Sequence, residues 1–212
     1  MVSKFNLSQP EITKITGFCG ILLPIVIFTF VGLAISHSPW FRWTDHALSD
    51  LGIAGISAFL FNTGLIIGGV LAFIFSLGLI KQLSNKAGAY LFSLSSLALI
   101  GIGIWPENVE TFHFITSAAF FVLIALFLIV TGFTIKQDKF ERSMGSLAII
   151  FAIMAVGSTS FLILWSGIAI PEIFSCFPAF IWCMIFGLKM TNAKKVVSSI
   201  STSLHLERAL QE

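Results

Sequence analysis

Six apolar stretches, each near the length that a helix needs to cross a lipid bilayer, constrain the fold of this chain more than any motif does. A helix rises 1.5 Å per residue, so about 20 residues span the hydrocarbon core. The stretches are residues 16–36, 57–80, 87–104, 112–135, 145–167 and 169–189. They predict an all-α, polytopic bundle of about six transmembrane helices. Almost nothing separates the last two stretches except Pro171, which suits the first turn of a new helix.

The same stretches divide the chain into three parts. These are an N-terminal segment 1–15, a six-helix transmembrane domain 16–189 and a tail 190–212. In the tail, one face of an amphipathic helix could carry Val196, Val197, Ile200 and Leu204. A disordered tail is the alternative.

The composition supports a membrane protein and argues against other classes. Hydrophobic residues make up 57% of the chain and charged residues only 10%, whereas soluble domains carry about 25% charged residues. The net charge is +2, without the basic run that tracks a phosphate backbone, so no nucleic acid partner is expected. The cysteines Cys19, Cys176 and Cys183 lie inside apolar stretches without paired spacing, which indicates packing residues.

The basic residues predict the orientation of the bundle. Short cytoplasmic loops are enriched in lysine and arginine. With six spans, eleven of the 12 basic residues fall on one side and only Arg42 on the other. Adding or removing a span would destroy this asymmetry. Both termini should therefore be cytoplasmic, and the chain should be a multi-pass protein of the cell membrane.

A cleaved signal peptide is the competing interpretation of the first stretch. Ala34-Ile35-Ser36 has the small-residue spacing of a cleavage site. The apolar stretch, however, is about 20 residues, longer than the usual 7 to 15 of a signal peptide. We expect an uncleaved first helix.

The first non-cytoplasmic connection, residues 37–52, is dense in groups that can carry chemistry. If Asp45 and the residues after it form a helical turn, His46 and Asp50 share a face, as do Asp45 and Ser49. A carboxylate could then orient an imidazole. Helix capping is the simpler interpretation for Ser49, because it precedes an apolar stretch.

The second non-cytoplasmic connection supplies further candidates. Pro106 should end the third helix, and Thr111 should cap the fourth. His113 then lies in the first turn of the fourth helix, where the helix dipole favours a neutral ring. Glu107 should emerge at the membrane surface after Pro106. In the third connection, Glu172 could join the site, although a first-turn acid needs no function.

Two more residues are candidates for contacting a substrate. Asn62 lies about five residues into the second stretch, and a buried amide there needs partners. A purely structural role for Asn62, as a hydrogen bond between helices, is an equally good explanation. Arg42 is the basic residue of the non-cytoplasmic side.

Several of these runs resemble an archaeal and bacterial membrane family known as domain of unknown function 998. The resemblance covers roughly residues 15–190 and rests on Ala47-Leu48-Ser49-Asp50-Leu51-Gly52, Phe61-Asn62, Gly64-Leu65-Ile66-Ile67-Gly68, Gly101-Ile102-Gly103, Pro106 and His113. It implies a six-helix membrane protein without an established activity. More distantly, the polar first loop resembles the family of the autophagy modulator DRAM and the lipid-remodelling factor of glycosylphosphatidylinositol anchors.

Two function classes follow from the candidate residues. The first is a lipid-directed hydrolase, which uses a divalent metal such as zinc or acid-base chemistry. Its candidate catalytic residues are His46, His113, Asp50, Asp45 and Ser49, its metal ligands His46, His113 and Asp50, and its substrate contacts Asn62, Arg42 and Glu107. The irregular spacing lacks the specificity of an HExxH helix.

The second class is a non-catalytic protein that binds a membrane lipid or a partner through its polar loops. Haem ligation by His46 and His113 is a third possibility, and transport is disfavoured because no charged residue lies in mid-span. Gly64 and Gly68 form a small-xxx-small pair, which predicts close packing inside the bundle, with a homo-oligomer as the alternative.

Overall fold

The computed structural model describes residues 8–135, 138–158, 160 and 166–209, with side chains up to Asn192. Within this part of the chain, six helices are long and apolar enough to cross a membrane. They are α1 (Gln9–Ser36), α2 (Gly55–Gln82), α3 (Ala87–Ile104), α4 (Glu110–Thr134), α5 (Lys139–Gly157) and α6 (Ala169–Ala209), and a short 3-10 helix, η1 (Ser49–Gly52), follows α1. The predicted all-α bundle of six spans is confirmed, and the chain is a multi-pass membrane protein.

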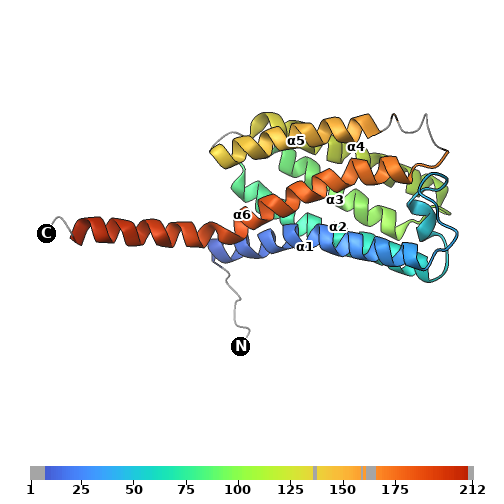
Figure 1. Ribbon diagram of the computed structural model, residues 1–212, viewed down its shortest axis with the longest axis horizontal. Coiled ribbons are helices and arrows are strands. Elements are labelled where there is room, and N and C mark those ends of the chain that lie inside the picture. Colours follow the sequence, from blue (N-terminus) through green and yellow to red (C-terminus); the bar gives the residue numbers. More distant parts are fainter. Residues whose placement is uncertain (1–7, 136–137, 159, 161–165, 210–212) are drawn as a thin grey trace.

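The helices form one bundle, and the first residues of α1 and the last residues of α6 lie toward the same end of it (Figure 1). The loop between α1 and α2 covers the opposite end, which we call the distal end. The connection between α3 and α4 and the start of α6 lie there as well. An even number of spans requires this arrangement of the termini. That the distal end is non-cytoplasmic stays a prediction from the basic residues.

The predicted bounds of the fifth helix are wrong, whereas the sixth helix begins at Ala169 as predicted. We expected the fifth helix at 145–167, but α5 begins at Lys139 and ends at Gly157. The early start has a local cause, because the Asp138 carboxylate caps the helix by accepting a hydrogen bond of 2.7 Å from the Glu141 amide. Residues 159 and 161–165 of the predicted span lie outside the described residues.

Two expectations about helix ends have different outcomes. Pro171 lies in the first turn of α6, as predicted. The predicted cap Thr111 lies inside α4, because that helix already begins at Glu110 and Val109 precedes it as the cap residue. Beyond residue 189, α6 continues to Ala209 and projects from the bundle (Figure 1). The tail side chains predicted to share one face lie outside the described residues.

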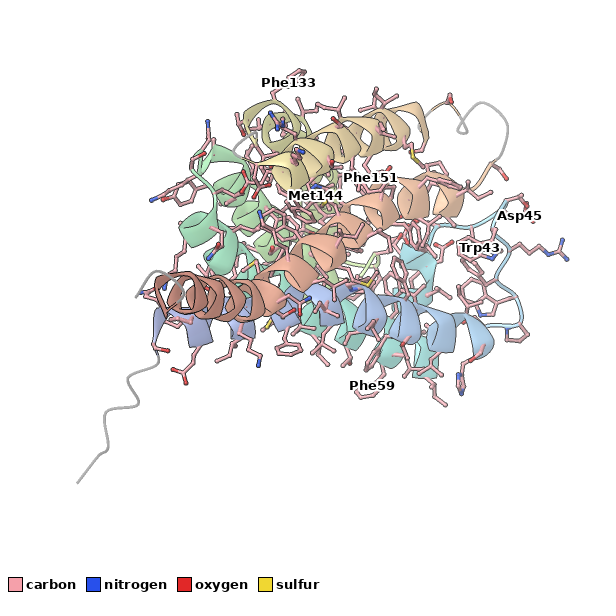
Figure 2. All side chains as sticks on the ribbon, turned by 60° about the vertical axis from the view of Figure 1, so that its left-hand side comes forward. Trp43, Asp45, Phe59, Phe133, Met144 and Phe151 are labelled. Carbon is pink, nitrogen blue, oxygen red and sulfur yellow. The ribbon has the colours of Figure 1, made fainter. Side chains whose placement is uncertain are left out.

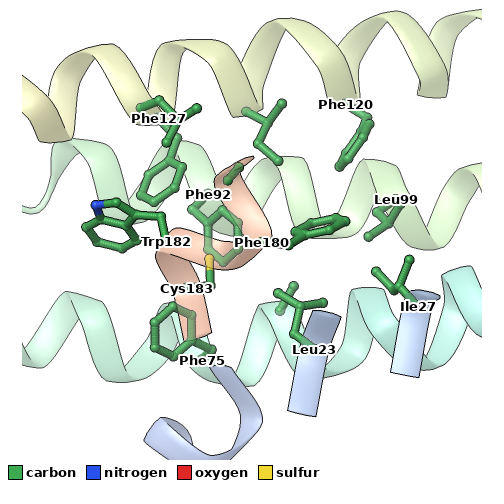
Figure 3. Packing of buried hydrophobic residues seen from close by; sticks show 14 of the residues in the cluster. Leu23, Ile27, Phe75, Phe92, Leu99, Phe120, Phe127, Phe180, Trp182 and Cys183 are labelled. Carbon is green, nitrogen blue, oxygen red and sulfur yellow. The ribbon is translucent and has the colours of Figure 1, made fainter. Parts of the chain in front are cut away.

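Aromatic side chains fill the centre of the bundle (Figure 3). The rings of Phe92 and Phe127 have centroids 4.7 Å apart, and Phe127 meets the edge of Trp182 at 5.2 Å. The Trp182 indole also donates a hydrogen bond of 2.9 Å to the Met144 carbonyl and so joins α6 to α5. At the periphery, Phe59 and Phe133 point away from the bundle (Figure 2). Such side chains contact lipid.

The glycines of α2 allow close packing inside the bundle, as the sequence predicted. A Cβ atom at Gly64 would overlap the Phe30 side chain of α1, and one at Gly68 would overlap Ile27. Small residues stabilise helix pairs in membranes by letting backbones approach. This face is therefore occupied by α1. A homo-oligomer stays a prediction.

Among the helical glycines, the closest approach to a backbone atom joins α6 to α1 and leads to a first prediction. A Cβ atom at Gly187 would overlap the Gly17 carbonyl oxygen, which is backbone and cannot rotate away. We expect Gly187→Ala to destabilise the protein by about 1–3 kcal/mol through overpacking. Thermal unfolding in detergent measures this loss. Gly32→Ala is the matched control, since a Cβ atom there meets nothing within 4 Å; equal midpoints for both variants would contradict the prediction.

Candidate functional site

The loop after α1 is fastened over the distal end by hydrogen bonds to distant helices. The Leu48 amide donates to the Glu172 carboxylate of α6. The Asn62 side-chain amide of α2 donates to the Gly52 carbonyl at 3.0 Å. The Ala169 amide donates to the backbone carbonyl of His46 at 3.0 Å. These bonds hold η1 across the end of the bundle, so its residues form a fixed roof.

A cavity of about 60 Å³ lies beneath this roof. Its walls come from α1, α2, α3, α4 and α6. The polar residues of its lining are Ser49 of η1, Ser117 of α4 and Glu172 of α6. The rest of the lining is apolar apart from Cys176. The cavity is large enough to hold water or several methylene groups. Its chemistry, apolar walls with a few polar groups, is typical of a small-molecule site.

Three carboxyl groups gather between the roof and the cavity. Asp50 and Glu107 both lie close enough to Glu172 to repel its charge. Burial raises the pKa of Glu107, and the neighbouring Asp50 raises it further, while Ser49 and His113 oppose the shift. One Glu107 oxygen, Oε2, is buried without a hydrogen-bond partner. A buried acceptor of this kind is costly to leave unpaired.

His113 is held in one orientation at the edge of this cluster. Its Nδ1 lies 3.0 Å from the Trp105 carbonyl oxygen, and its Nε2 lies 3.3 Å from the Ser117 hydroxyl. A carbonyl oxygen can only accept, so Nδ1 must carry the proton of the neutral ring and donate it. Nε2 is then the acceptor. The predicted placement of His113 in the first turn of α4 agrees with the structure.

The structure brings only part of the predicted site together. Four of the predicted side chains lie together around one carboxyl group: Ser49, Asp50, Glu107 and His113. Asn62 supports this group, because its hydrogen bond to Gly52 holds the roof in place. Ser49 is 7% exposed and lines the cavity. The Asp50 carboxylate accepts a hydrogen bond of 2.9 Å from the Ala47 amide. Capping, our simpler interpretation of Ser49, is wrong, because Ser49 is the first residue of η1, Leu48 takes the cap position, and this helix has no side-chain cap.

The remaining predicted residues form a separate group on the loop. The His46 ring packs on Trp40, with centroids 5.1 Å apart, and its Nδ1 accepts a hydrogen bond from the Arg42 amide. Asp45 pairs with the exposed Arg42 side chain at 3.8 Å. Asp45 lies at the outer edge of the loop (Figure 2). These interactions stay within the loop and stabilise its fold.

The predicted metal ligands do not form a group in this structure. Among the described residues, no three His, Cys, Asp or Glu side chains are placed to hold a metal ion. The rings of His46 and His113 hydrogen-bond to different segments, one within its own loop and one to the end of α3. Zinc binding stays a prediction without geometric support.

Ser117 is the residue of the site that the sequence analysis missed. It lies four positions after His113 on α4, and side chains at this spacing meet on a helix. The spacing was therefore a usable signal. Serines in apolar helices, however, usually bond their own backbone, which makes such a pair easy to overlook. Glu172, which we expected could join the site, does so.

The chain was compared with known proteins. A family model described as "Protein of unknown function (DUF998)" matches residues 20–189. No curated protein and no solved structure matches the chain. The match includes the whole of α2 to α5 and parts of α1 and α6, and it contains Ser49, Asp50, Glu107, His113, Ser117 and Glu172.

Proposed function

The chain belongs to the DUF998 family, and we propose that it binds a membrane amphiphile at the distal end, with the alkyl chain in the cavity and an amine-bearing head group at the carboxyl cluster. The observation that carries this proposal is an apolar cavity lined by Ser49 and Glu172, which both interact with Glu107, whose buried Oε2 lacks a partner. A ligand with an apolar tail and a hydrogen-bond donor matches both features. The bilayer supplies such molecules directly.

The negative charge of the carboxyl cluster favours an amine head group over a phosphate. Asp50, Glu107 and Glu172 are three acidic groups, and within the described residues no lysine or arginine forms an ion pair with them. A phosphate at this position would face like charges without a compensating cation. A protonated amine supplies three donors and a positive charge, and hydrogen bonds to charged groups are about twice as strong as neutral ones.

The apolar walls of the cavity favour binding of an alkyl chain. Leu65, Ile102 and Phe180 contribute apolar surface, and the volume of about 60 Å³ accommodates part of a chain rather than a whole lipid. The remainder of the ligand would stay in the bilayer. Ester hydrolysis is a second candidate function, favoured by the contact between the cavity residue Ser117 and the imidazole of His113.

Blocking the cavity tests the binding function. Leu65 lines the cavity, whereas Ile67 on the same helix faces outward and is 41% exposed. We expect Leu65→Trp to weaken binding of dodecylamine to the detergent-purified protein at least tenfold, because the indole fills the space that the chain needs. Ile67→Trp should bind as the unmodified protein does. Equilibrium binding by calorimetry gives both constants, and equal affinities for the two variants would refute the cavity as the binding site.

A further inference from the structure

We infer that Ser117 and His113 form a nucleophile and general-base pair that cleaves a carboxylic ester of an amphiphile bound in the cavity. This inference rests on the proposed binding function and adds a reaction to it. The two side chains are in contact, one on the cavity wall and one behind it. Activated serines elsewhere have this arrangement, in which a third group orients the base.

The hydrogen bonds of His113 prepare it to accept a proton. The Trp105 carbonyl fixes the proton of the neutral ring on Nδ1, so the lone pair of Nε2 faces the Ser117 hydroxyl at 3.3 Å. Glu107 lies close enough to attract a positive charge when His113 gains a proton. This carboxylate would therefore stabilise the imidazolium that forms during the reaction, as the third member of a triad does.

The Ser117 hydroxyl differs from its neighbours in what it contacts. Thr116, the preceding residue, bonds to the Phe112 and His113 carbonyls of its own helix, and Ser96 bonds to the Phe92 carbonyl in the same way. Such back-bonding is the ordinary behaviour of hydroxyl groups in apolar helices. Ser117 instead contacts an imidazole. Its hydroxyl is available for chemistry at the cavity.

The depth of Ser117 suits an ester of a membrane amphiphile. Ser117 follows Glu110, the first residue of α4, by seven positions, which corresponds to roughly 10 Å along the helix. The headgroup layer on each side of a bilayer is several ångströms thick, since about 40–45 Å of membrane surrounds about 30 Å of hydrocarbon. With the start of α4 at the outer edge of the headgroup layer, Ser117 would lie within about 5 Å of the level where acyl chains join their head groups.

The reaction proceeds in two balanced steps. Ser117 Oγ attacks the ester carbonyl while its proton moves to His113 Nε2, and the bond to the alcohol then breaks as Nε2 returns the proton to the leaving oxygen. The acyl group is now on Ser117. Water from the adjoining aqueous phase attacks this ester, Nε2 takes its proton, and the carboxylic acid leaves as Ser117 Oγ is protonated again. Ser49, the other hydroxyl on the lining, donates a hydrogen bond to Glu107 and so helps to hold that carboxylate near the pair.

Labelling with a long-chain alkyl fluorophosphonate tests the pair independently of turnover. Attack by an activated serine forms an Oγ–P bond and releases fluoride. Mass spectrometry of the full-length protein in detergent should place the label on Ser117. Ser117→Ala should lose it, and His113→Gln should react about 100-fold more slowly, a typical contribution of a general base. Thr116→Ala, beside the pair, should label at the unmodified rate.

The same samples separate this inference from the binding proposal on which it rests. Dodecylamine binding by the unmodified protein without a label on Ser117 would overturn the inference and leave the binding function intact. A label on Ser117 without amine binding would support the pair and refute the proposed head group. A label at another residue, or equal rates for His113→Gln and the unmodified protein, would also refute the pair. Because the unmodified protein reports the labelled residue, the test does not depend on a variant that folds.

Discussion

Trp182→Ala is expected to lower the free energy of unfolding by about 3 kcal/mol, the largest loss of stability among the predictions made for this protein. Trp182 is fully buried, stacks on Phe186 with centroids 5.0 Å apart and meets Phe127 edge-on. Truncation of a large buried aromatic costs about 3–5 kcal/mol in soluble proteins. Helix association in lipid lacks the hydrophobic component of that cost, so we expect the lower end of the range.

Two control variants separate packing from hydrogen bonding. Trp182→Phe keeps an aromatic ring but removes the donor to the Met144 carbonyl, and should cost about 1 kcal/mol. Phe133→Ala truncates an aromatic residue that is 64% exposed toward lipid, and should change stability little. Unfolding in mixed micelles by increasing denaturing detergent measures all three. Equal losses for Trp182→Ala and Phe133→Ala would contradict the central role of the aromatic core.

The six helices could be predicted because their cause is local to the sequence. Each span needs a run of apolar residues, and the run 87–104 coincides with α3. The prediction failed where a helix extends beyond its apolar run. The first turns of α5 are polar, and the cap at Asp138 rather than hydropathy determines where that helix begins.

The candidate site was predicted only in part, because the sequence does not show how the loop folds. We paired His46 with Asp50 on the assumption of a helical turn beginning near Asp45. Only Ser49–Gly52 is helical, as a 3-10 turn, so the four-residue spacing does not align these side chains. Glu107 and His113 were placed correctly because Pro106 lies just beyond the end of α3 and α4 begins shortly afterwards.

The proximity of Glu172 to this cluster depends on packing between distant elements. The hydrogen bond that ties it to the roof joins residues separated by 124 positions. No spacing rule within one helix can reveal such a contact. The sequence could show that an acid begins the sixth helix, but only the bundle shows that it faces the loop after the first.

Glu107→Gln is expected to weaken binding of dodecylamine about tenfold or more, which is the largest effect on binding expected from removing one charge. The carboxylate oxygen without a partner would accept a charge-assisted hydrogen bond from the ammonium group, and such bonds contribute about 1.5–3 kcal/mol. Asp45→Asn removes an acid that pairs with Arg42 on the loop, and should leave the affinity unchanged. Dodecanol, which lacks the charge, should bind both variants and the unmodified protein equally.

The pH dependence of the same binding gives a second measurement of the role of Glu107. Burial and Asp50 raise the pKa of Glu107 above its ordinary value of 4.5, so this carboxylate gains its proton at a higher pH than an exposed one. The amine stays protonated throughout this range, since aliphatic amines such as lysine have a pKa near 10.4. Affinity should therefore be full above the raised pKa and fall as the pH is lowered through it. Titrations in detergent between about pH 8 and pH 4 should show this fall for the unmodified protein and a flatter profile for Glu107→Gln. Identical profiles would exclude Glu107 as the group that binds the amine.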